Sequence, residues 1–126
     1  MENKNPTVAV VVATYNGATY LRAQLESIVQ QTYKPSQIII VDDASVDDTL
    51  QVANNFAAHH PEVMVVQNET RLGYIKNFEK GMLLTNANYI ALSDQDDIWM
   101  TNKLEVLIHA IDDQMLAYSD SELIDA

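Results

Sequence analysis

Short apolar runs alternate with helix-period stripes four times along this chain, and this alternation restricts the possible folds more than any other feature. The runs cover residues 8–13, 37–41, 63–67 and 89–93. They are continuous and mostly rich in β-branched residues, which is typical of strands buried on both faces. Four strands that each lead into a helix predict an α/β fold: a mostly parallel sheet with right-handed crossovers, covered by helices on both faces in three α/β/α layers.

Apolar residues between and after the runs recur at the three- and four-residue spacing of a helix face. The four stripes are Leu21, Leu25, Ile28 and Val29; Val52, Ala53, Phe56 and Ala57; Ile75, Phe78, Met82 and Leu83; and Leu104, Leu107, Ile108 and Ile111. Residues 115–120 begin a further strand, and residues 121–126 show no closing helix. We expect residues 1–126 to belong to a single domain.

The charge balance excludes several classes of partner. The chain contains 18 Asp and Glu but only 7 Lys and Arg, for a formal net charge of −11, so it has no basic stripe for nucleic acid or an anionic membrane. It contains no cysteine, which agrees with a reducing cytoplasm. No apolar run approaches the roughly 18 residues of a membrane-spanning helix. We expect a cytoplasmic chain whose parent protein contacts a membrane only through other segments.

Polar residues follow three of the predicted strands directly. Residues 15–16 follow the first strand, residues 42–43 the second and residues 94–96 the fourth. In open parallel sheets, ligands bind beyond the carboxyl ends of the strands. We therefore expect these three segments, which are far apart in the sequence, to meet in one crevice.

The densest acidic segment comes after the fourth strand, where Asp94, Asp96 and Asp97 lie within four residues. Two carboxylates about 4 Å apart repel each other by about 4 kcal/mol at an effective dielectric constant of about 20. A positive charge between the three carboxylates is therefore expected. Mg²⁺ or Mn²⁺ is the natural candidate, because both prefer oxygen ligands and keep open positions for a substrate diphosphate.

Four segments of the chain share their order and spacing with a known family. They are residues 8–17, ending in Ala-Thr-Tyr-Asn-Gly; Gln31-Thr32-Tyr33; residues 38–49, with Asp-Asp-Ala-Ser; and residues 89–99, ending in Ser-Asp-Gln-Asp-Asp-Ile-Trp. Together they resemble the nucleotide-sugar-binding half of a family 2 glycosyltransferase of the GT-A fold, over about residues 7–120. The last segment is similar to bacterial rhamnosyl- and related transferases of surface polysaccharides. The resemblance implies a UDP- or dTDP-sugar donor, a glycan or lipid-linked acceptor, and inverting transfer to an acceptor hydroxyl.

The resemblance assigns the acidic segment to the donor diphosphate. It implies that Asp96, together with Asp94, ligates Mn²⁺ or Mg²⁺, while Asp94 and Gln95 reach the ribose and metal-bound water. Such a cation acts as a Lewis acid on the departing nucleoside diphosphate. Asp97 has an alternative explanation, because a carboxylate there can start or cap the next helix.

The resemblance also implies how the base is bound. Asp43 would accept a hydrogen bond from the N3–H of uracil or thymine and reject cytosine, which has no N–H at that position. The base would stack on Tyr15, and the backbone near Ala13 would add a hydrogen bond. Arg71 would contact the base or a phosphate, although an exposed arginine is more often simply solvated.

Several neighbouring residues have structural explanations of their own. Ser45 and Asp48 have the spacing of a capping box for the helix that follows. Thr14 or Asn16 can equally be the cap of the first helix. Under these interpretations, the side chains serve the helix ends and not a ligand.

Family 2 catalytic domains continue well beyond this length, so we expect a piece truncated at its C-terminus, with the general base beyond Ala126, that binds donor without transferring sugar. The alternative is a non-catalytic nucleotide-binding module.

Two other classes of nucleotide- or phosphate-binding protein do not fit the sequence. A signalling receiver needs an acceptor Asp after a middle strand, but the third strand ends in Gln67-Asn68. The three glycines cannot form a P-loop or a dinucleotide fingerprint.

Overall fold

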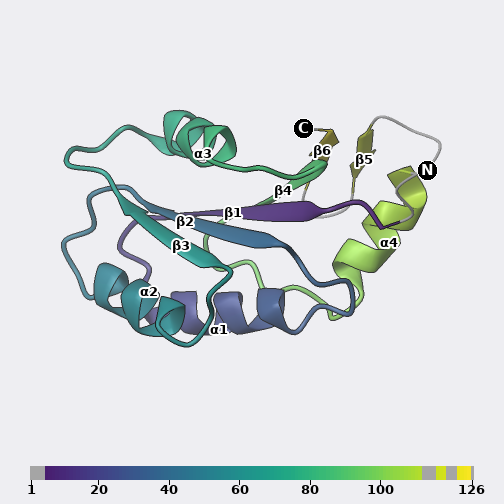
Figure 1. Ribbon diagram of the computed structural model, residues 1–126. Helices are drawn as coiled ribbons and strands as arrows, with labels where there is room; N and C mark the ends of the chain where they lie inside the picture. Colours follow the sequence, from purple (N-terminus) through teal and green to yellow (C-terminus); the bar gives the residue numbers. More distant parts are fainter. Residues whose placement is uncertain (1–4, 112–115, 119–121, 126) are drawn as a thin grey trace.

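The computed structural model describes residues 5–111, 116–118 and 122–125, in which strands and helices alternate (Figure 1). The elements are β1 (Val8–Thr14), α1 (Ala18–Val29), β2 (Gln37–Asp42), α2 (Thr49–Ala57), β3 (Val63–Gln67), α3 (Tyr74–Leu83), β4 (Tyr89–Ser93), α4 (Lys103–Ala110), β5 (Leu116–Tyr118) and β6 (Glu122–Asp125). The first four strands and the four helices were predicted; β1 and β2 each extend one residue further. None of the described helices has both the length and the apolar composition needed to cross a membrane.

The strands form a mixed sheet with the order β3-β2-β1-β4-β6-β5. β1 pairs in parallel with β2 and β4, and β3 pairs in parallel with β2. β6 runs antiparallel to both β4 and β5. The mostly parallel sheet is therefore confirmed. β5 falls within the strand predicted over residues 115–120, of which 115, 119 and 120 lie outside the described residues. β6 was not predicted.

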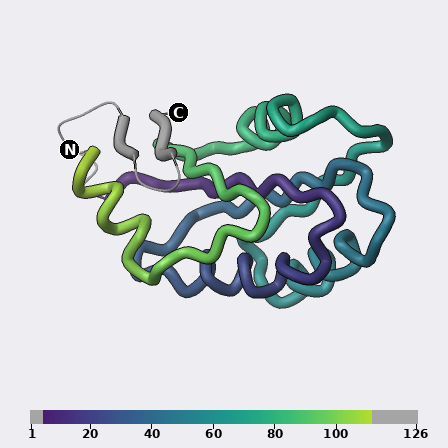
Figure 2. The backbone as a smooth tube through the Cα atoms, turned by 180° about the vertical axis from the view of Figure 1, so that it is seen from behind, coloured from purple at the N-terminus to yellow at the C-terminus, as the bar shows by residue number. Residues whose placement is uncertain are grey.

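Helices cover both faces of the sheet and give the three predicted layers (Figure 1). Of the described helices, α3 covers one face, and α1, α2 and α4 contribute to the core on the other. Figure 2 shows the same layers from behind. β1 is buried along its whole length, because its alternate side chains enter the two cores. Because β1 is held on both faces, the loop that follows it begins at a fixed position in the molecule.

The predicted apolar stripe of α3 is partly wrong, whereas the stripes of the other three helices are buried or half-buried as expected. Phe78 is buried, but Ile75 and Leu83 are exposed, and Gly81 lies on the buried face. A Cβ atom on Gly81 would lie 2.4 Å from Cγ1 of Val11. The glycine therefore lets α3 approach the sheet closely, and only Phe78 and the half-buried Met82 of the predicted stripe pack against it.

The start of α1 is capped by Asp47, in the loop that precedes α2, and by Thr49, the first residue of α2. The N–H of Gly17 donates to Oγ1 of Thr49 at 2.8 Å, and the N–H of Ala18 donates to Oδ2 of Asp47 at 3.3 Å. Oδ1 of Asp47 accepts from both the hydroxyl and the N–H of Thr49. These hydrogen bonds, the hydroxyl's above all, hold the pKa of Asp47 below its usual value against the opposing effect of burial.

The predicted helix caps are therefore corrected. Asp48 is the N-cap of α2 but makes no side-chain cap hydrogen bond, and Ser45 donates instead to Asp42. Neither Thr14 nor Asn16 caps α1, whose N-cap residue makes no side-chain cap hydrogen bond. The groups that cap α1 come from a segment far away in the sequence, so short spacing rules do not identify them. At the start of α2, Asp47 accepts locally from the N–H of Thr49.

Candidate functional site

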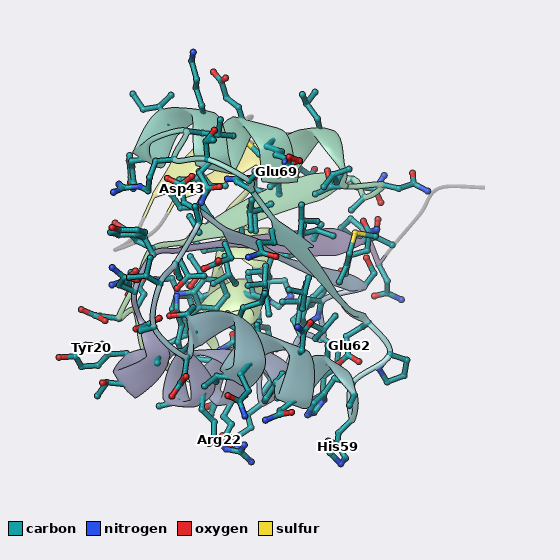
Figure 3. The ribbon with its side chains drawn as sticks, turned by 90° about the vertical axis from the view of Figure 1, so that its left-hand side faces the viewer. Tyr20, Arg22, Asp43, His59, Glu62 and Glu69 are labelled. Atoms are coloured by element: carbon teal, nitrogen blue, oxygen red, sulfur yellow. The ribbon has the colours of Figure 1, made fainter. Side chains whose placement is uncertain are left out.

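A pocket of about 200 Å³ opens at the carboxyl end of the parallel strands. Its walls are formed by Ala13, Thr14, Tyr15, Asp43, Arg71, Tyr74, Asn77, Asp94 and Gln95. Figure 3 views this end of the molecule and labels Asp43, which lies between α3 above and the helices α1 and α2 below. The strand ends thus meet in one crevice as expected, and every predicted site residue except Asp96 lines it.

Asp43 is a buried carboxylate whose two oxygens are both occupied. Its side chain is 4% exposed. Oδ1 accepts from Nδ2 of Asn68 at 2.9 Å and from the N–H of Leu72 at 2.8 Å. Oδ2 accepts from the N–H of Gly73 at 3.1 Å and from Nε of Arg71 at 3.2 Å. Burial raises the pKa of Asp43, but these hydrogen bonds outweigh it and lower the pKa below its usual value.

Arg71 lies across the mouth of the pocket. Besides its ion pair with Asp43, its guanidinium carbon is 3.6 Å from the centroid of the Tyr15 ring, in a cation–π contact. Its side chain is 53% exposed. Arg71 is therefore not simply solvated: it covers one face of the aromatic ring on which a base was expected to stack.

The ends of β1 and β4 are fixed to each other and to α1. The N–H of Tyr15 donates to Oε1 of Gln95 at 2.9 Å. Nε2 of Gln24, a buried residue of α1, donates to the carbonyl oxygen of Asp94 at 2.6 Å. The side chain of Gln95 thus orients the backbone of Tyr15 in this structure, and its expected contact with a ribose stays a prediction.

Thr14 adds a polar group that the sequence analysis treated only as a possible helix cap. It lines the pocket, and no described residue forms a hydrogen bond with its buried Oγ1. A buried hydroxyl without a partner costs about 1–3 kcal/mol. A ligand or water that reaches this hydroxyl would therefore be favoured.

The acidic segment after β4 does not form the expected cage of three carboxylates. Asp94 and Asp96 are exposed, whereas Oδ2 of Asp97 accepts from Nε1 of Trp99 at 3.3 Å. Within the described part of the chain, no three acidic or histidine side chains lie close enough to hold a metal ion. Asp97 does not cap the next helix either, because α4 begins only at Lys103.

The carboxylates of Asp94 and Asp96 suit a cation that a bound diphosphate helps to hold. Oδ1 of Asp94 accepts from the N–H of Gln95 at 2.8 Å, and no hydrogen bond links the carboxylate of Asp96 to another described residue. Mg²⁺ and Mn²⁺ are commonly held by one or two carboxylates together with water and substrate phosphates. The donor set therefore fits a divalent cation that arrives with a diphosphate, with Asp94 and Asp96 as its candidate protein ligands.

Left-handed backbone conformations occur just after three of the strands. Asn16 has φ 50°, Ala44 has φ 63° and Asp96 has φ 72°. Asn and Asp tolerate this region because their short polar side chains can form local hydrogen bonds. Alanine has the same clash of its Cβ without such a hydrogen bond, so the conformation is unfavourable for it. Such conformations cluster at functional sites, where the surrounding structure enforces them. Their positions agree with a site at this edge of the sheet.

Sequence reasoning also missed two residues that line the pocket. Tyr74 and Asn77 line it from α3, and Asn68 lies behind Asp43. Asn68 and Asn77 are 3% and 2% exposed. The available signal was the pair Asn77 and Gly81, which share a helix face at a four-residue spacing. A polar and a small residue on one face indicate a close approach to the sheet, not an apolar stripe.

The sequence profile of Glycosyl transferase family 2 matches residues 9–121. The chain belongs to this family. The matched range includes every residue that lines the pocket.

Two bacterial relatives of the family align with most of the chain. The dTDP-rhamnosyl transferase RfbG of Shigella flexneri is 38% identical over 105 residues, which are 79% of this chain and 36% of that protein. The UDP-Glc:alpha-D-GlcNAc-diphosphoundecaprenol beta-1,3-glucosyltransferase WfaP of Escherichia coli is 32% identical over 114 residues, 90% of this chain and 45% of that protein. The chain thus spans less than half the length of these relatives.

Two solved structures share the fold. The mannosyltransferase PcManGT from Pyrobaculum calidifontis, in complex with GDP-Man and Mn²⁺, superposes with a TM-score of 0.81 and 26% identity over 88% of this chain and 34% of that chain. TarS 1-349 of S. aureus in complex with UDP superposes with a TM-score of 0.76 and 26% identity over 87% and 33%. The predicted GT-A fold is therefore confirmed.

Proposed function

We propose that this chain is the donor-binding part of a metal-dependent glycosyltransferase that uses a UDP- or dTDP-sugar. The observation that carries the proposal is one pocket in which Tyr15, Asp43 and Arg71 gather beside Asp94. One side of the pocket offers an aromatic ring and a carboxylate, which suit a base. The other side offers exposed carboxylate oxygen, which suits a cation. A nucleotide sugar needs both, because it combines a base with a diphosphate.

Asp43 is the reader of the base in this proposal. Its lowered pKa keeps the carboxylate ionised at neutral pH, so it only accepts hydrogen bonds. Uracil and thymine have an N–H at ring position 3 that can donate to this carboxylate. Cytosine has only a lone pair on N3, so the carboxylate would face it without a hydrogen bond. Tyr15 provides the stacking surface. The hydroxyl of Thr14, which has no hydrogen-bond partner among the described residues, is available for a further polar contact beside the backbone of Ala13.

Asp94 and Asp96 hold Mn²⁺ or Mg²⁺ in this proposal, and PcManGT in complex with Mn²⁺ supports it. When bound, the cation neutralises negative charge on the departing nucleoside diphosphate. The chain's own contribution is positional: Gln24 fixes the backbone of Asp94. Arg71, the cationic side chain among the described residues that line the pocket, can pair with a phosphate.

The reaction that we propose is inverting transfer to a hydroxyl of a glycan or lipid-linked acceptor, in cytoplasmic steps of bacterial polysaccharide synthesis. Two relatives support such partners: RfbG is a dTDP-rhamnosyl transferase, and WfaP is a UDP-Glc-dependent glucosyltransferase with a diphosphoundecaprenol-linked acceptor. The general base is expected beyond Ala126. The chain alone would then bind donor without transferring sugar.

Calorimetric titration with UDP, dTDP, CDP and GDP, each with and without Mn²⁺, tests the donor assignment. We expect UDP and dTDP to bind more tightly than CDP by about 1–3 kcal/mol, the cost of a buried polar group left unpaired, and all binding to weaken strongly without the cation. GDP is the informative competitor, because PcManGT was solved with GDP-Man. Tighter binding of GDP than of UDP and dTDP would contradict the proposed base.

A separate assay tests the absence of transfer. The chain is incubated with labelled UDP- and dTDP-sugars, Mn²⁺ and a panel of glycan and lipid-linked acceptors. We expect donor binding without product, because transfer requires both reactants to be held together. Robust transfer by the chain alone would show that the general base lies within these residues.

A further inference from the structure

A buried polar network lies behind Asp43, on the side of α3. Nζ of Lys80 donates to Oδ1 of Asn68 at 2.7 Å. Nδ2 of Asn68 donates to Oδ1 of Asp43 at 2.9 Å and to Oδ1 of Asn77 at 2.7 Å. Nδ2 of Asn77 donates to the carbonyl oxygen of Val41 at 3.0 Å. The network thus connects the middle of α3 to the carboxylate and to the strand that carries it.

The orientation of both amides is fixed by neighbours that have only one hydrogen-bonding role. An ammonium only donates, so Lys80 requires the oxygen of the Asn68 amide, and a carboxylate only accepts, so Asp43 requires its nitrogen. A carbonyl only accepts, so Val41 requires the nitrogen of the Asn77 amide. Turning either amide over would place like groups against each other. The network therefore has a single arrangement.

The two oxygens of Asp43 differ as a result. The donors to Oδ1 include the amide of Asn68, which is 3% exposed and held from both sides. The donors to Oδ2 include Nε of Arg71, whose side chain is 53% exposed. Arg71 can leave for solvent with its charge still hydrated, whereas Asn68 cannot leave without stranding buried polar groups. An incoming N–H can therefore replace a protein donor at Oδ2 but not at Oδ1.

We propose that Asn68, Asn77 and Lys80 are positioning residues that keep Oδ1 of Asp43 occupied and so present Oδ2 as the single oxygen that accepts from a base. This inference rests on the proposed function, in which Asp43 reads the N3–H of uracil or thymine. Lys80 acts only through Asn68 and need not contact the nucleotide. It therefore determines base selectivity from outside the pocket.

Three variants of α3 test the positioning role. Lys80→Met keeps the alkyl stem and removes the donor; Lys80→Arg restores a cationic donor; Lys76→Met makes the same change at an exposed position of the same helix. The affinities of UDP and CDP are measured by calorimetry in the presence of Mn²⁺. We expect Lys80→Met to reduce the UDP-to-CDP affinity ratio by about 3- to 10-fold, the effect of one misplaced hydrogen bond. Lys80→Arg should recover most of the ratio, and Lys76→Met should retain it.

An unchanged UDP-to-CDP affinity ratio in Lys80→Met would overturn the positioning role, whether or not both affinities fall. A purely structural role would weaken the binding of both nucleotides equally and would not distinguish the bases. A readout without nucleotide separates this failure from failure of the proposed function. The side-chain amide resonances of Asn68, measured by NMR, should shift and lose protection from hydrogen exchange in Lys80→Met and stay unchanged in Lys76→Met. If the wild-type chain binds neither nucleotide, the proposed function fails, and with it the assigned role, even where the resonances confirm the network.

Discussion

Two strands on either side of β1 end in aspartates with opposite surroundings. Asp43, after β2, is buried, and both of its oxygens accept hydrogen bonds from other residues. Asp96, after β4, is exposed, and among the described residues none forms a hydrogen bond with its carboxylate. The same side chain is thus fixed at one strand end and left to the solvent at the other.

The difference shows how one sheet edge can separate two tasks. A buried carboxylate with all its partners in place has one orientation, so a group that approaches it must match that orientation. An exposed carboxylate keeps its hydration and can exchange water for a cation at little cost. In the proposed function, the β2 end recognises the base and the β4 end balances the charge of the diphosphate. Four changes test this division.

The largest expected effect is the loss of stability in Asp43→Ala. The change leaves the buried amide of Asn68 and the N–H groups of Leu72 and Gly73 without their acceptor, so we expect the free energy of unfolding to fall by about 3 kcal/mol or more. Urea unfolding at neutral pH measures it. Asp96→Asn should differ from wild type by less than about 0.5 kcal/mol. Similar small losses in both variants would remove the contrast.

The second effect is the loss of ligand binding in Asp96→Asn. In Asp96→Asn, we expect Mn²⁺-dependent affinity for UDP to fall by about 10- to 100-fold, the range seen when a metal site is weakened. The fold should be kept, because asparagine tolerates a left-handed backbone as well as aspartate does. Glu69→Gln, an equal change of charge at an exposed residue of the β3–α3 loop, is the control. A similar loss in both variants would indicate a general charge effect.

The third effect is a pH dependence of stability. The pKa of Asp43 is lower in the folded chain than in the unfolded chain, so its contribution is present above the unfolded value of about 3.9 and is lost as the pH falls through the folded value. The stability difference between wild type and Asp43→Asn should therefore be constant from about pH 5 to 7 and narrow below about pH 4. Asp47, whose pKa is also lowered, is present in both chains and cancels. Urea unfolding at several pH values measures this difference in the free energy of unfolding. A difference that stays constant down to pH 3 would contradict the lowered pKa of Asp43.

The smallest effect concerns the backbone beside Asp43. Ala44 has a left-handed φ of 63°, which costs a residue with a Cβ about 1–2 kcal/mol. Ala44→Gly removes this cost but adds the entropy of a glycine in the unfolded chain, so we expect a net gain of about 0.5 kcal/mol. Thermal unfolding measures it, with Ala18→Gly in α1 as a control that should lose stability. A loss in Ala44→Gly would show that the strain is offset elsewhere.

Much of the fold could be predicted because its signals are local. The β-branched runs identify the four parallel strands, and a residue directly after a strand, such as Asp43 or Asp94, must lie at the edge of the sheet. The stripe of α3 failed because local spacing does not show how closely a helix approaches. Gly81 and Asn77 replace large apolar residues there.

The partners of the site residues could not be predicted, because they depend on contacts between distant segments. The N–H groups of Leu72 and Gly73 reach Asp43 only after the β3–α3 loop has folded over β2. Asp47 caps α1 because the loops before α1 and α2 meet in space. Hydrogen bonds of this kind have no fixed spacing in the sequence.

The central place of β1 also has a consequence for synthesis of the chain. β1 leaves the ribosome before the other described strands. Val8 pairs with Tyr89 on β4, so one edge of this largely apolar strand stays unpaired until a partner is made much later. An unpaired apolar edge is a template for association with other chains, and distant pairings form slowly. We expect the nascent chain to need shielding of β1 throughout this interval. Nucleotide would then bind only once β4 has emerged, which makes ligand binding a reporter of the last step in assembling the sheet centre.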